Sequence, residues 1–466
     1  MLTPASSRRL LRTTPATTLA EIPQTLNPEA LETAEELQAF YQSSIQEVRG
    51  INRTGQLKLC LEDAHAAQFP FKAFLLGHPG VGKTTELSKL LLDLDNRFRP
   101  LRLNITSELN PGTLRFYDVL LLILIRLVYE VSQPSVIGFE DTDLPKMLAD
   151  VRDHLATRWT KHLRVDEAEF GASLGHNIPF LKLFGNIKQG RTRERGSEDY
   201  ELSFVSELTD LMNSVLQECN RLLRKNQKGR EWVIVIEDLE KIGLAADALK
   251  DLFMGLRPSL QGLDAHFIIV IPIWLQYSEH AAIVLPPNFK SFVVPDIAVY
   301  QKNHQKDEKV IAALRSVVTA RVSKDLFADD VLERFCIASG GNLRDLFLMI
   351  RNAMLSARLR YANVISVEDA DGAVASLRND YKQLLGSTGQ EDAETPLSEK
   401  LDRLVAIYQR KDPTVEVPDR VLYLLLRQRC ALQYNGTGWI GVHPLIVDLL
   451  IEFARLEQNS PGGSRL

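Results

Sequence analysis

Short apolar runs alternate with helical patterns over the first 300 residues of the chain. One of these runs, Trp232–Ile236, has almost no polar residue, as expected for the centre of a parallel sheet covered on both faces. Five such runs predict strands over about 71–76, 101–105, 232–236, 266–271 and 291–294. Helical patterns cover about 27–67, 83–94, 111–131, 200–225 and 245–260. We therefore predict a doubly wound, five-stranded parallel α/β domain over residues 27–300.

Beyond residue 300 the apolar positions follow a helical period only. Four predicted helices, at about 305–323, 328–338, 342–360 and 367–385, form an α-helical lid domain over residues 301–385. A polar linker, 386–396, precedes a last unit over residues 397–458. That unit combines helices at about 397–410, 418–428 and 444–455 with a hairpin at 431–442, whose Asn435-Gly436 pair is a strong turn signal. Helices with a small hairpin predict a winged-helix domain.

Three segments fall outside these domains. Residues 1–26 carry Arg8, Arg9 and Arg12 before the first acid, a composition that suits either a transit peptide or, as we prefer, a disordered tail. Residues 459–466 form a second predicted tail. Residues 133–200 show no clean period and are interpreted as an insertion in the α/β domain. Its aromatic side chains and basic run could dock on a partner or membrane, or form a plain packed hairpin; they are Phe170, Phe180, Phe184 and residues 188–195.

The stretch from Gly77 to Thr85 has the spacing G-x-x-x-x-G-K-[ST] between a predicted strand and a predicted helix, as a P-loop requires. Its glycines let backbone N–H groups approach phosphate, and the helix beginning near Lys83 points its positive end at the same anion. Lys83 is expected to reach the β- and γ-phosphates, and Thr84 to complete a Mg²⁺ shell. The predicted ATP- or ADP-binding residues are Gly77, His78, Pro79, Gly80, Val81, Gly82, Lys83, Thr84 and Thr85.

Two acids, Glu237 and Asp238, directly follow the buried run 232–236. A carboxylate at the end of a strand facing a P-loop holds Mg²⁺ directly or through water, and its neighbour can orient the attacking water. We therefore predict Glu237 and Asp238, with Thr84, as metal residues, and both acids with Lys83 as catalytic residues. Glu precedes Asp, the reverse of the common order, which indicates slow hydrolysis. The alternative is an ordinary strand end with exposed acids.

Two residues far along the chain are candidates for sensing the nucleotide. Arg344 lies in the first turn of a helix that two glycines and Asn342 introduce, so it could fold back onto the γ-phosphate. The alternative is a surface arginine paired with Asp345 or a neighbouring acid. His443 begins the last predicted helix and could reach the β-phosphate of a bound diphosphate. The alternative is a structural histidine that caps this helix.

Composition adds few constraints. The 466 residues are 45% hydrophobic and 25% charged, which is ordinary for a soluble globular protein. The net charge of −5 gives no global reason to expect nucleic-acid binding. The most apolar stretch, Val119–Ile125, is too short to span a bilayer, so no transmembrane segment is predicted. Scattered cysteines without ligand-like spacing indicate reduced thiols in a cytoplasmic protein: Cys60, Cys219, Cys336 and Cys430.

The strand order, the Glu237-Asp238 pair, the lid with Gly340-Gly341-Asn342-Leu343-Arg344 and the terminal winged helix resemble the AAA+/STAND class of P-loop ATPases over roughly residues 60–455. The resemblance implies an ASCE-type core, a sensor 2 role for Arg344, and a winged-helix histidine at His443 that corresponds to the Met-His-Asp motif only at that residue. The P-loop and the Val442-His443-Pro444-Leu445 stretch are similar to those of bacterial ATPases often found in antiviral defence.

Two departures from that class change the expected function. The fourth predicted strand ends in Ile271-Pro272-Ile273, without the polar residue of a sensor 1, and no arginine lies between Arg257 and Arg315 to serve as an arginine finger. We therefore predict a slow ATPase that acts as a nucleotide-controlled conformational switch and becomes a homo-oligomer in the ATP state, with a separate effector protein downstream. The alternative is a DNA-associated AAA+ ATPase of the replication-initiator or transposition-regulator type.

Overall fold

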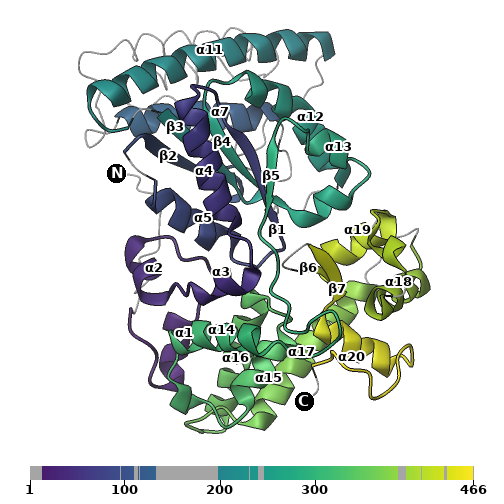
Figure 1. Cartoon of the computed structure of the whole chain (residues 1–466). Coiled ribbons are helices and arrows are strands. Elements are labelled where there is room, and N and C mark those ends of the chain that lie inside the picture. Colours follow the sequence, from purple (N-terminus) through teal and green to yellow (C-terminus); the bar gives the residue numbers. More distant parts are fainter. Residues whose placement is uncertain are drawn as a thin grey trace, which may run out of the picture.

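A computed structural model places a parallel β-sheet with its helices at one end of the molecule, and a helical lid beside a winged helix at the other (Figure 1). It describes residues 13–94, 96–109, 114, 116–132, 198–229, 231–239, 246–386, 395–410, 412–434 and 438–464. The strands of the sheet are β1 Lys72–Gly77, β2 Phe98–Asn104, β3 Glu231–Glu237, β4 His266–Pro272 and β5 Lys290–Val293. The predicted five-stranded parallel sheet is therefore confirmed.

The strands lie in the order β2-β3-β4-β1-β5, and every pair is parallel. Strand β4 thus separates the P-loop strand β1 from the acidic strand β3, the arrangement expected of an ASCE-type core. Leu76 pairs with Ile271, and Ile236 pairs with Ile269. Because parallel strands end at the same edge, this register brings the carboxyl ends of β1 and β3 to one side of the sheet.

Alternate residues of each strand face opposite layers of helices, as the period of a strand dictates. In β1, Phe74 and Leu76 belong to one buried cluster, whereas Ala73 and Leu75 belong to the other. The first cluster includes residues of α7 (Phe116–Ser132), α11 (Glu198–Lys225) and α12 (Ala246–Gly262). The second includes residues of α4 (Arg53–Ala66) and α5 (Lys83–Leu92). The sheet is covered on both faces, so the doubly wound architecture is confirmed.

The lid contains α14 (Glu308–Thr319), α15 (Val331–Ala338), α16 (Leu343–Leu359) and α17 (Val367–Gly386). Asp307 caps α14 by accepting hydrogen bonds from two backbone N–H groups, and Asn342 caps α16 in the same way. The turn before α16 contains Gly341 at φ +87°, where an added Cβ would lie 1.8 Å from the carbonyl oxygen of Ile297. Only glycine lets this turn approach the chain segment that follows β5.

The winged helix contains α18 (Leu397–Gln409), α19 (Arg420–Arg427), the antiparallel strands β6 (Ala431–Tyr434) and β7 (Trp439–Val442), and α20 (Pro444–Glu452). The predicted hairpin is present, although its Asn435-Gly436 tip lies outside the described residues. Helix α19 packs on the short helix η4 (Ile273–Tyr277) that follows β4: Tyr423 and Trp274 meet edge to face at 5.5 Å. The winged helix is thus docked on the α/β domain.

The N-terminal region differs from its prediction. The helical pattern expected over 27–67 is divided into α2 (Ala34–Phe40), α3 (Ser44–Arg49) and α4, and Gly50 ends α3 at φ +79°. Residues 13–26 are not a disordered tail, because Ala16 and Val322 form a parallel bridge and Leu19 and Ile22 are buried against the lid. Figure 1 shows α2 and α3 between the sheet and the lid.

The C-terminal residues up to 464 also pack, contrary to the predicted tail. Ser464 donates its backbone N–H to Asp448 at 3.1 Å, and the Tyr300 hydroxyl donates to the Gly463 carbonyl at 2.7 Å. Residues 133–197 of the predicted insertion, with its three phenylalanines and basic run, lie outside the described residues. All four cysteines are free, as expected. No described helix is long and apolar enough to span a membrane.

Candidate nucleotide-binding site

The P-loop joins β1 to α5 at the carboxyl edge of the sheet. Gly80 and Gly82 have φ values of +87° and +98°, which side chains rarely adopt, so the loop needs glycine at both positions. Lys83 is the first residue of α5, and its ammonium donates to the Gly77 and His78 carbonyls, each at 3.0 Å. The sequence-predicted loop thus wraps around its own lysine at a helix N-terminus, the geometry of an anion-binding cradle.

Two further P-loop carbonyls are held by residues from other parts of the chain. Asn342 of the lid donates from Nδ2 to the Pro79 carbonyl at 2.9 Å. Arg49, at the end of α3, donates to the Val81 carbonyl. Gly80 makes the first contact feasible, since a Cβ there would lie 2.4 Å from Asn342 Oδ1 and 2.6 Å from Arg344 Cβ. The conformation of the loop therefore depends on the lid and on the N-terminal segment.

His78 connects the P-loop to the winged helix. Its ring is 1% exposed, and its Nε2 accepts a hydrogen bond from the Gln433 backbone N–H in β6 at 3.4 Å. Burial keeps the pKa of His78 well below its usual value, so the neutral ring can accept this bond. The same nitrogen lies 3.9 Å from the Asp296 carboxyl group. Burial raises the pKa of Asp296 to about 7. Asp296 in turn donates its backbone N–H to the Gln433 carbonyl at 3.0 Å.

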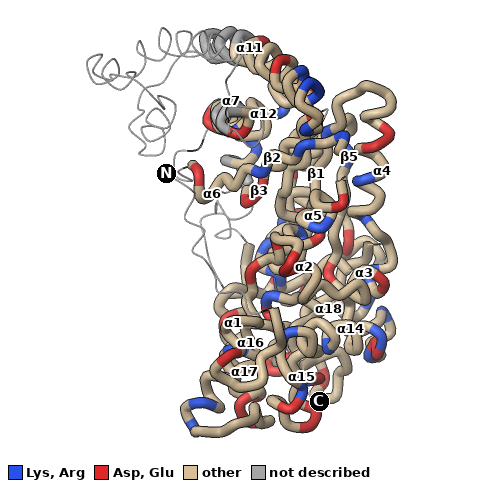
Figure 2. Tube along the Cα trace, turned by 90° about the vertical axis from the view of Figure 1, so that its left-hand side faces the viewer, with Lys and Arg blue, Asp and Glu red and all other residues tan. Residues whose placement is uncertain are grey.

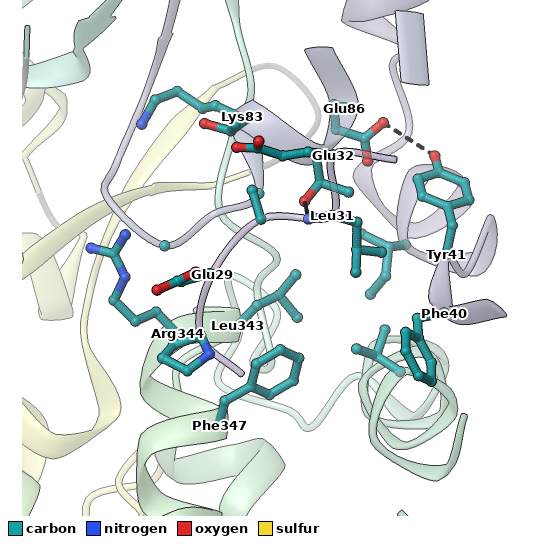
Figure 3. A pocket seen from close by; sticks show the side chains of 18 of the residues that line it. Glu29, Leu31, Glu32, Phe40, Tyr41, Lys83, Glu86, Leu343, Arg344 and Phe347 are labelled. Atoms are coloured by element: carbon teal, nitrogen blue, oxygen red, sulfur yellow. Dashed lines mark hydrogen bonds between the residues drawn. The ribbon is translucent and has the colours of Figure 1, made fainter. Parts of the chain in front are cut away.

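A cavity of about 330 Å³ opens beside the P-loop and is bounded by the α/β domain, the lid and the N-terminal segment (Figure 3). Its polar end contains Lys83, Thr84 and Thr85 of α5. Its apolar part is lined by Phe40, Ile45, Val317, Leu343 and Phe347. Arg321 lies between two of these rings, 5.1 Å from the Phe40 centroid and 5.3 Å from that of Phe347. A phosphate cradle adjoining an aromatic, partly cationic wall suits a nucleotide, with the base in the apolar part.

Both predicted acids line this cavity. Asp238 has φ +67° and its carboxylate accepts a hydrogen bond from the Thr106 hydroxyl at 3.1 Å. Glu237 accepts from Arg102 of β2 at 3.0 Å from Nε and 2.5 Å from Nη2, whereas its second oxygen, Oε1, is buried with no partner among the described residues. Burial raises the pKa of Glu237, and the Arg102 guanidinium opposes that rise.

The residues present fit a hydrated Mg²⁺ ion that arrives with the nucleotide. Thr84, Glu237 and Asp238 all line the cavity, and the unpaired Glu237 oxygen can accept from a metal-bound water. No group of three or more His, Cys, Asp or Glu side chains in the described part of the chain could hold a metal ion alone. Mg²⁺ commonly binds through one or two protein oxygens plus substrate phosphates and waters.

Arg344 also lines the cavity, from the first turn of α16 (Figure 3). Its neighbour Asp345 faces the other way: Asp345 is fully buried, accepts from the Tyr381 hydroxyl at 2.7 Å, and pairs with Arg429 of the winged helix at 3.0 Å. The alternative in which Arg344 pairs with Asp345 is therefore wrong. The structure brings Arg344 and the P-loop together.

His443 does not reach the cavity, contrary to the expected contact with a bound diphosphate. It is fully buried at the start of α20, accepts from the Leu445 backbone N–H at 3.2 Å, and stacks on Tyr381 with centroids 4.5 Å apart. Burial lowers its pKa to about 4, so the ring is neutral at neutral pH. An added Cβ on Gly340 would lie 3.0 Å from His443 Nε2, which places the histidine against the turn that leads to Asn342 and Arg344.

The sequence pattern did not predict the contribution of the N-terminal segment. Tyr41 and Arg49 both line the cavity, and both contact Glu86 of α5, at 3.1 and 3.0 Å. The Leu31 backbone N–H donates to the Thr85 hydroxyl at 3.1 Å. Leu31, Tyr41 and Arg49 belong to no spaced motif. The sequence indicated only a helical pattern over residues 27–67.

Comparisons with known proteins give similarity only among solved structures; no protein-family model and no curated protein matches the chain. The chain is similar to the Aeropyrum pernix ORC2 protein at 12% identity and a TM-score of 0.41, covering 86% of this chain and 93% of that one. It is similar to the Walker-type ATPase PABY2304 of Pyrococcus abyssi at 11% identity and a TM-score of 0.44, covering 92% and 99%. The chain is also similar to Cdc6p from Pyrobaculum aerophilum at 15% identity and a TM-score of 0.36, covering 92% of this chain and 98% of that one.

These identities and TM-scores assign no activity or partner to the present chain. Its class rests on its own geometry: a glycine-rich loop between β1 and α5, the sheet order β2-β3-β4-β1-β5, and acids at the end of β3. Together they define an α/β P-loop nucleotide-binding fold that carries a helical lid and a winged helix.

Proposed function

We propose that the protein is a slow, Mg²⁺-dependent ATPase in which the bound nucleotide controls the docking of the lid and the winged helix. The observation that carries this proposal is that two consecutive P-loop residues contact the two domains directly. Pro79 accepts a hydrogen bond from Asn342 of the lid, and His78 accepts one from Gln433 of the winged helix. A change in the P-loop therefore acts on both domains at once.

Lys83 supplies the coupling step. In the present arrangement its ammonium satisfies the Gly77 and His78 carbonyls. When Lys83 turns towards phosphate, these carbonyls lose their donor and the loop must readjust around His78. Bound Mg²⁺ would neutralise phosphate charge, with Thr84 and the acids of β3 holding it directly or through water. Arg344 adds a cation on the lid side, so that ATP and ADP can interact differently with the lid.

The docked arrangement buries polar atoms that release of the two domains would expose to water. Four buried polar atoms near the junction have no hydrogen-bond partner among the described residues: His78 Nδ1, Asp296 Oδ2, Gln433 Oε1 and His443 Nε2. Each unsatisfied buried group costs about 1–3 kcal/mol. The difference in contact between two nucleotides can therefore tip the equilibrium between docked and released states.

The Gln433 amide proton is a direct probe, because it is the one donated to His78. Hydrogen exchange of the full-length protein should show this amide protected with ADP and exchanging at least tenfold faster with a non-hydrolysed ATP analogue. The change should be lost in His78→Ala and retained in His280→Ala, a histidine that precedes α13 (Ala281–Val284) and belongs to neither the P-loop nor β6. Equal protection of Gln433 with both nucleotides would contradict the proposed coupling.

DNA association is the second candidate, because the helix before the hairpin of such a domain is the element that can enter a major groove. Here that helix, α19, is buried against η4, with Arg427 over the Trp274 ring at 5.5 Å. Basic and acidic positions are also interleaved along the described trace (Figure 2). DNA binding by α19 thus requires release of the winged helix, and salt-dependent gel shifts with ATP but not with ADP would support it.

Assembly in the ATP state and a separate effector are further parts of the proposal. Release of the lid and winged helix from the α/β domain would expose surfaces that the docked arrangement buries, including the apolar face of α19. Such surfaces favour association with another copy or a partner. The signalling or antiviral setting rests on the sequence resemblance alone.

A further inference from the structure

Arg49 is a buried arginine that joins the N-terminal segment to the P-loop. It ends α3, is 2% exposed, and lines the nucleotide cavity, yet it belongs to no recognised motif. We propose that Arg49 is a positioning residue that fixes the phosphate-binding conformation of the P-loop. This inference rests on the proposed nucleotide binding and adds a residue that sets its affinity.

The guanidinium of Arg49 has two well-defined anchors. Nη1 donates to the Glu86 carboxylate at 3.0 Å, and Nη2 donates to the Val81 carbonyl. Nε is buried and has no partner among the described residues. Arg49 thus uses its fork to connect a side chain of α5 with the backbone of the P-loop.

The contact with Val81 determines where the next N–H points. In a planar trans peptide the carbonyl and the following N–H lie on opposite sides, so holding the Val81 carbonyl outside the loop directs the Gly82 N–H inward. Gly82 has φ +98° and lies directly under the guanidinium, since a Cβ there would be 3.6 Å from Arg49 Nη2. Asn342 acts in the same way on the Pro79–Gly80 peptide from the lid side.

Glu86 keeps Arg49 in this position. Its carboxylate is 5% exposed and also accepts from the Tyr41 hydroxyl at 3.1 Å, a bond drawn in Figure 3. A lysine in place of Arg49 would retain the charge opposite Glu86, but its single ammonium lacks the planar fork that spans both anchors. The Arg49→Lys variant therefore separates the positioning role from the buried charge pair.

The experiment is a fluorescence titration of full-length wild type, Arg49→Lys and Arg49→Ala with a fluorescent ADP analogue, together with steady-state ATPase kinetics. Arg53→Lys, at the first residue of α4, where the arginine donates to Gln56 at 3.1 Å, is the matched control. We expect Kd and KM to rise about tenfold or more in both Arg49 variants, with kcat changed less than threefold, because the lost contact supports ground state and transition state alike. The number of binding sites per chain should stay at the wild-type value.

An unchanged Kd in Arg49→Lys overturns this inference, whether or not Arg49→Ala folds. A fall in the number of active binding sites at an unchanged Kd would also overturn it, because that result describes a residue needed only for folding. Failure of the wild type to bind nucleotide would overturn the proposed function as well, so the two failures are distinguishable.

Discussion

Asn342 and Pro79 lie 263 positions apart, yet the Asn342 side chain donates to the Pro79 carbonyl at 2.9 Å. The same side chain caps α16, because its Oδ1 accepts from the backbone N–H groups of Arg344 and Asp345 at 3.2 and 3.3 Å. The Asn342 amide therefore contacts the P-loop through its N–H group and caps the lid helix α16 through its oxygen. The position of Arg344 at the cavity follows from this double contact.

Asn342→Asp separates these two roles. Aspartate still caps α16 but has no N–H for Pro79, and it adds charge beside Asp296, to which Asn342 now donates at 3.5 Å. We expect ADP affinity to fall about tenfold and the free energy of unfolding to fall by about 1–3 kcal/mol. Asn52→Asp, at the cap of α4, is the control and should change neither quantity measurably. Equal ADP affinity in all three proteins would show that the lid does not support the P-loop.

Gly341→Ala should destabilise the fold strongly. The residue has φ +87°, and the new Cβ would lie 1.8 Å from the Ile297 carbonyl oxygen, so backbone must move. We expect a loss of more than about 2 kcal/mol in the free energy of unfolding, measured by urea denaturation. Gly372→Ala, within α17, meets no atom within 4 Å and should stabilise the protein by about 0.4–1 kcal/mol. Similar effects of the two substitutions would mean that the lid turn does not pack as described.

His443 should make the protein sensitive to acid. Its pKa is about 4 in the fold against 6.5 for a free histidine, because burial disfavours the charged ring. Between these values the unfolded chain binds the proton and the folded chain does not, so stability is complete above pH 6.5 and falls as the pH drops towards 4. Full protonation of His443 lowers the free energy of unfolding by about 3 kcal/mol.

Denaturation of wild type and His443→Asn between pH 4 and pH 8 tests this expectation. Asparagine can still cap α20, so the difference between the two proteins isolates the titration of His443. Asp296, whose pKa burial raises to about 7, acts in the opposite direction but is present in both proteins. The wild type should lose stability relative to the variant as the pH falls. A difference that stays constant with pH would mean that His443 is not buried in the neutral form.

Arg102→Met should move the acid limb of the ATPase pH–rate profile to higher pH. Burial already raises the pKa of Glu237, and Arg102 is the group that opposes the rise, so its removal keeps the carboxyl protonated to a higher pH. Arg99→Met is the control, because Arg99 lies on the same strand but pairs with Glu130 at 2.7 Å. A shift of the limb to lower pH, or an equal shift in both variants, would exclude this role for Arg102.

The sequence pattern was sufficient for the local features of the site. Apolar runs predicted all five strands, and the spacing from Gly77 to Thr84 predicted the phosphate cradle, because both depend on neighbouring residues. The acids of β3 followed from their position at the end of a buried apolar run, where a carboxylate facing a P-loop can hold Mg²⁺. These predictions required no knowledge of how the domains pack.

Long-range contacts could not be predicted in the same way. Arg49 and Asn342 reach the P-loop through tertiary packing, and neither has a spacing that would distinguish it from a surface residue or a simple helix cap. His443 was expected at the phosphates, but it is fully buried against Gly340 and does not line the cavity. Residues 13–26 are rich in threonine and show no long apolar run, but Leu19 and Ile22 are buried against the lid.

The proposed switch is tested most directly by measuring the mass and radius of gyration of the full-length protein in solution with ADP, with ATP and with a slowly hydrolysed ATP analogue. The nucleotide that remains bound after purification should be identified in the same preparation. We predict a compact monomer that retains ADP, and an expanded chain that assembles into oligomers with the analogue. A protein whose mass and radius are identical in all three states would contradict nucleotide control of the lid and winged helix.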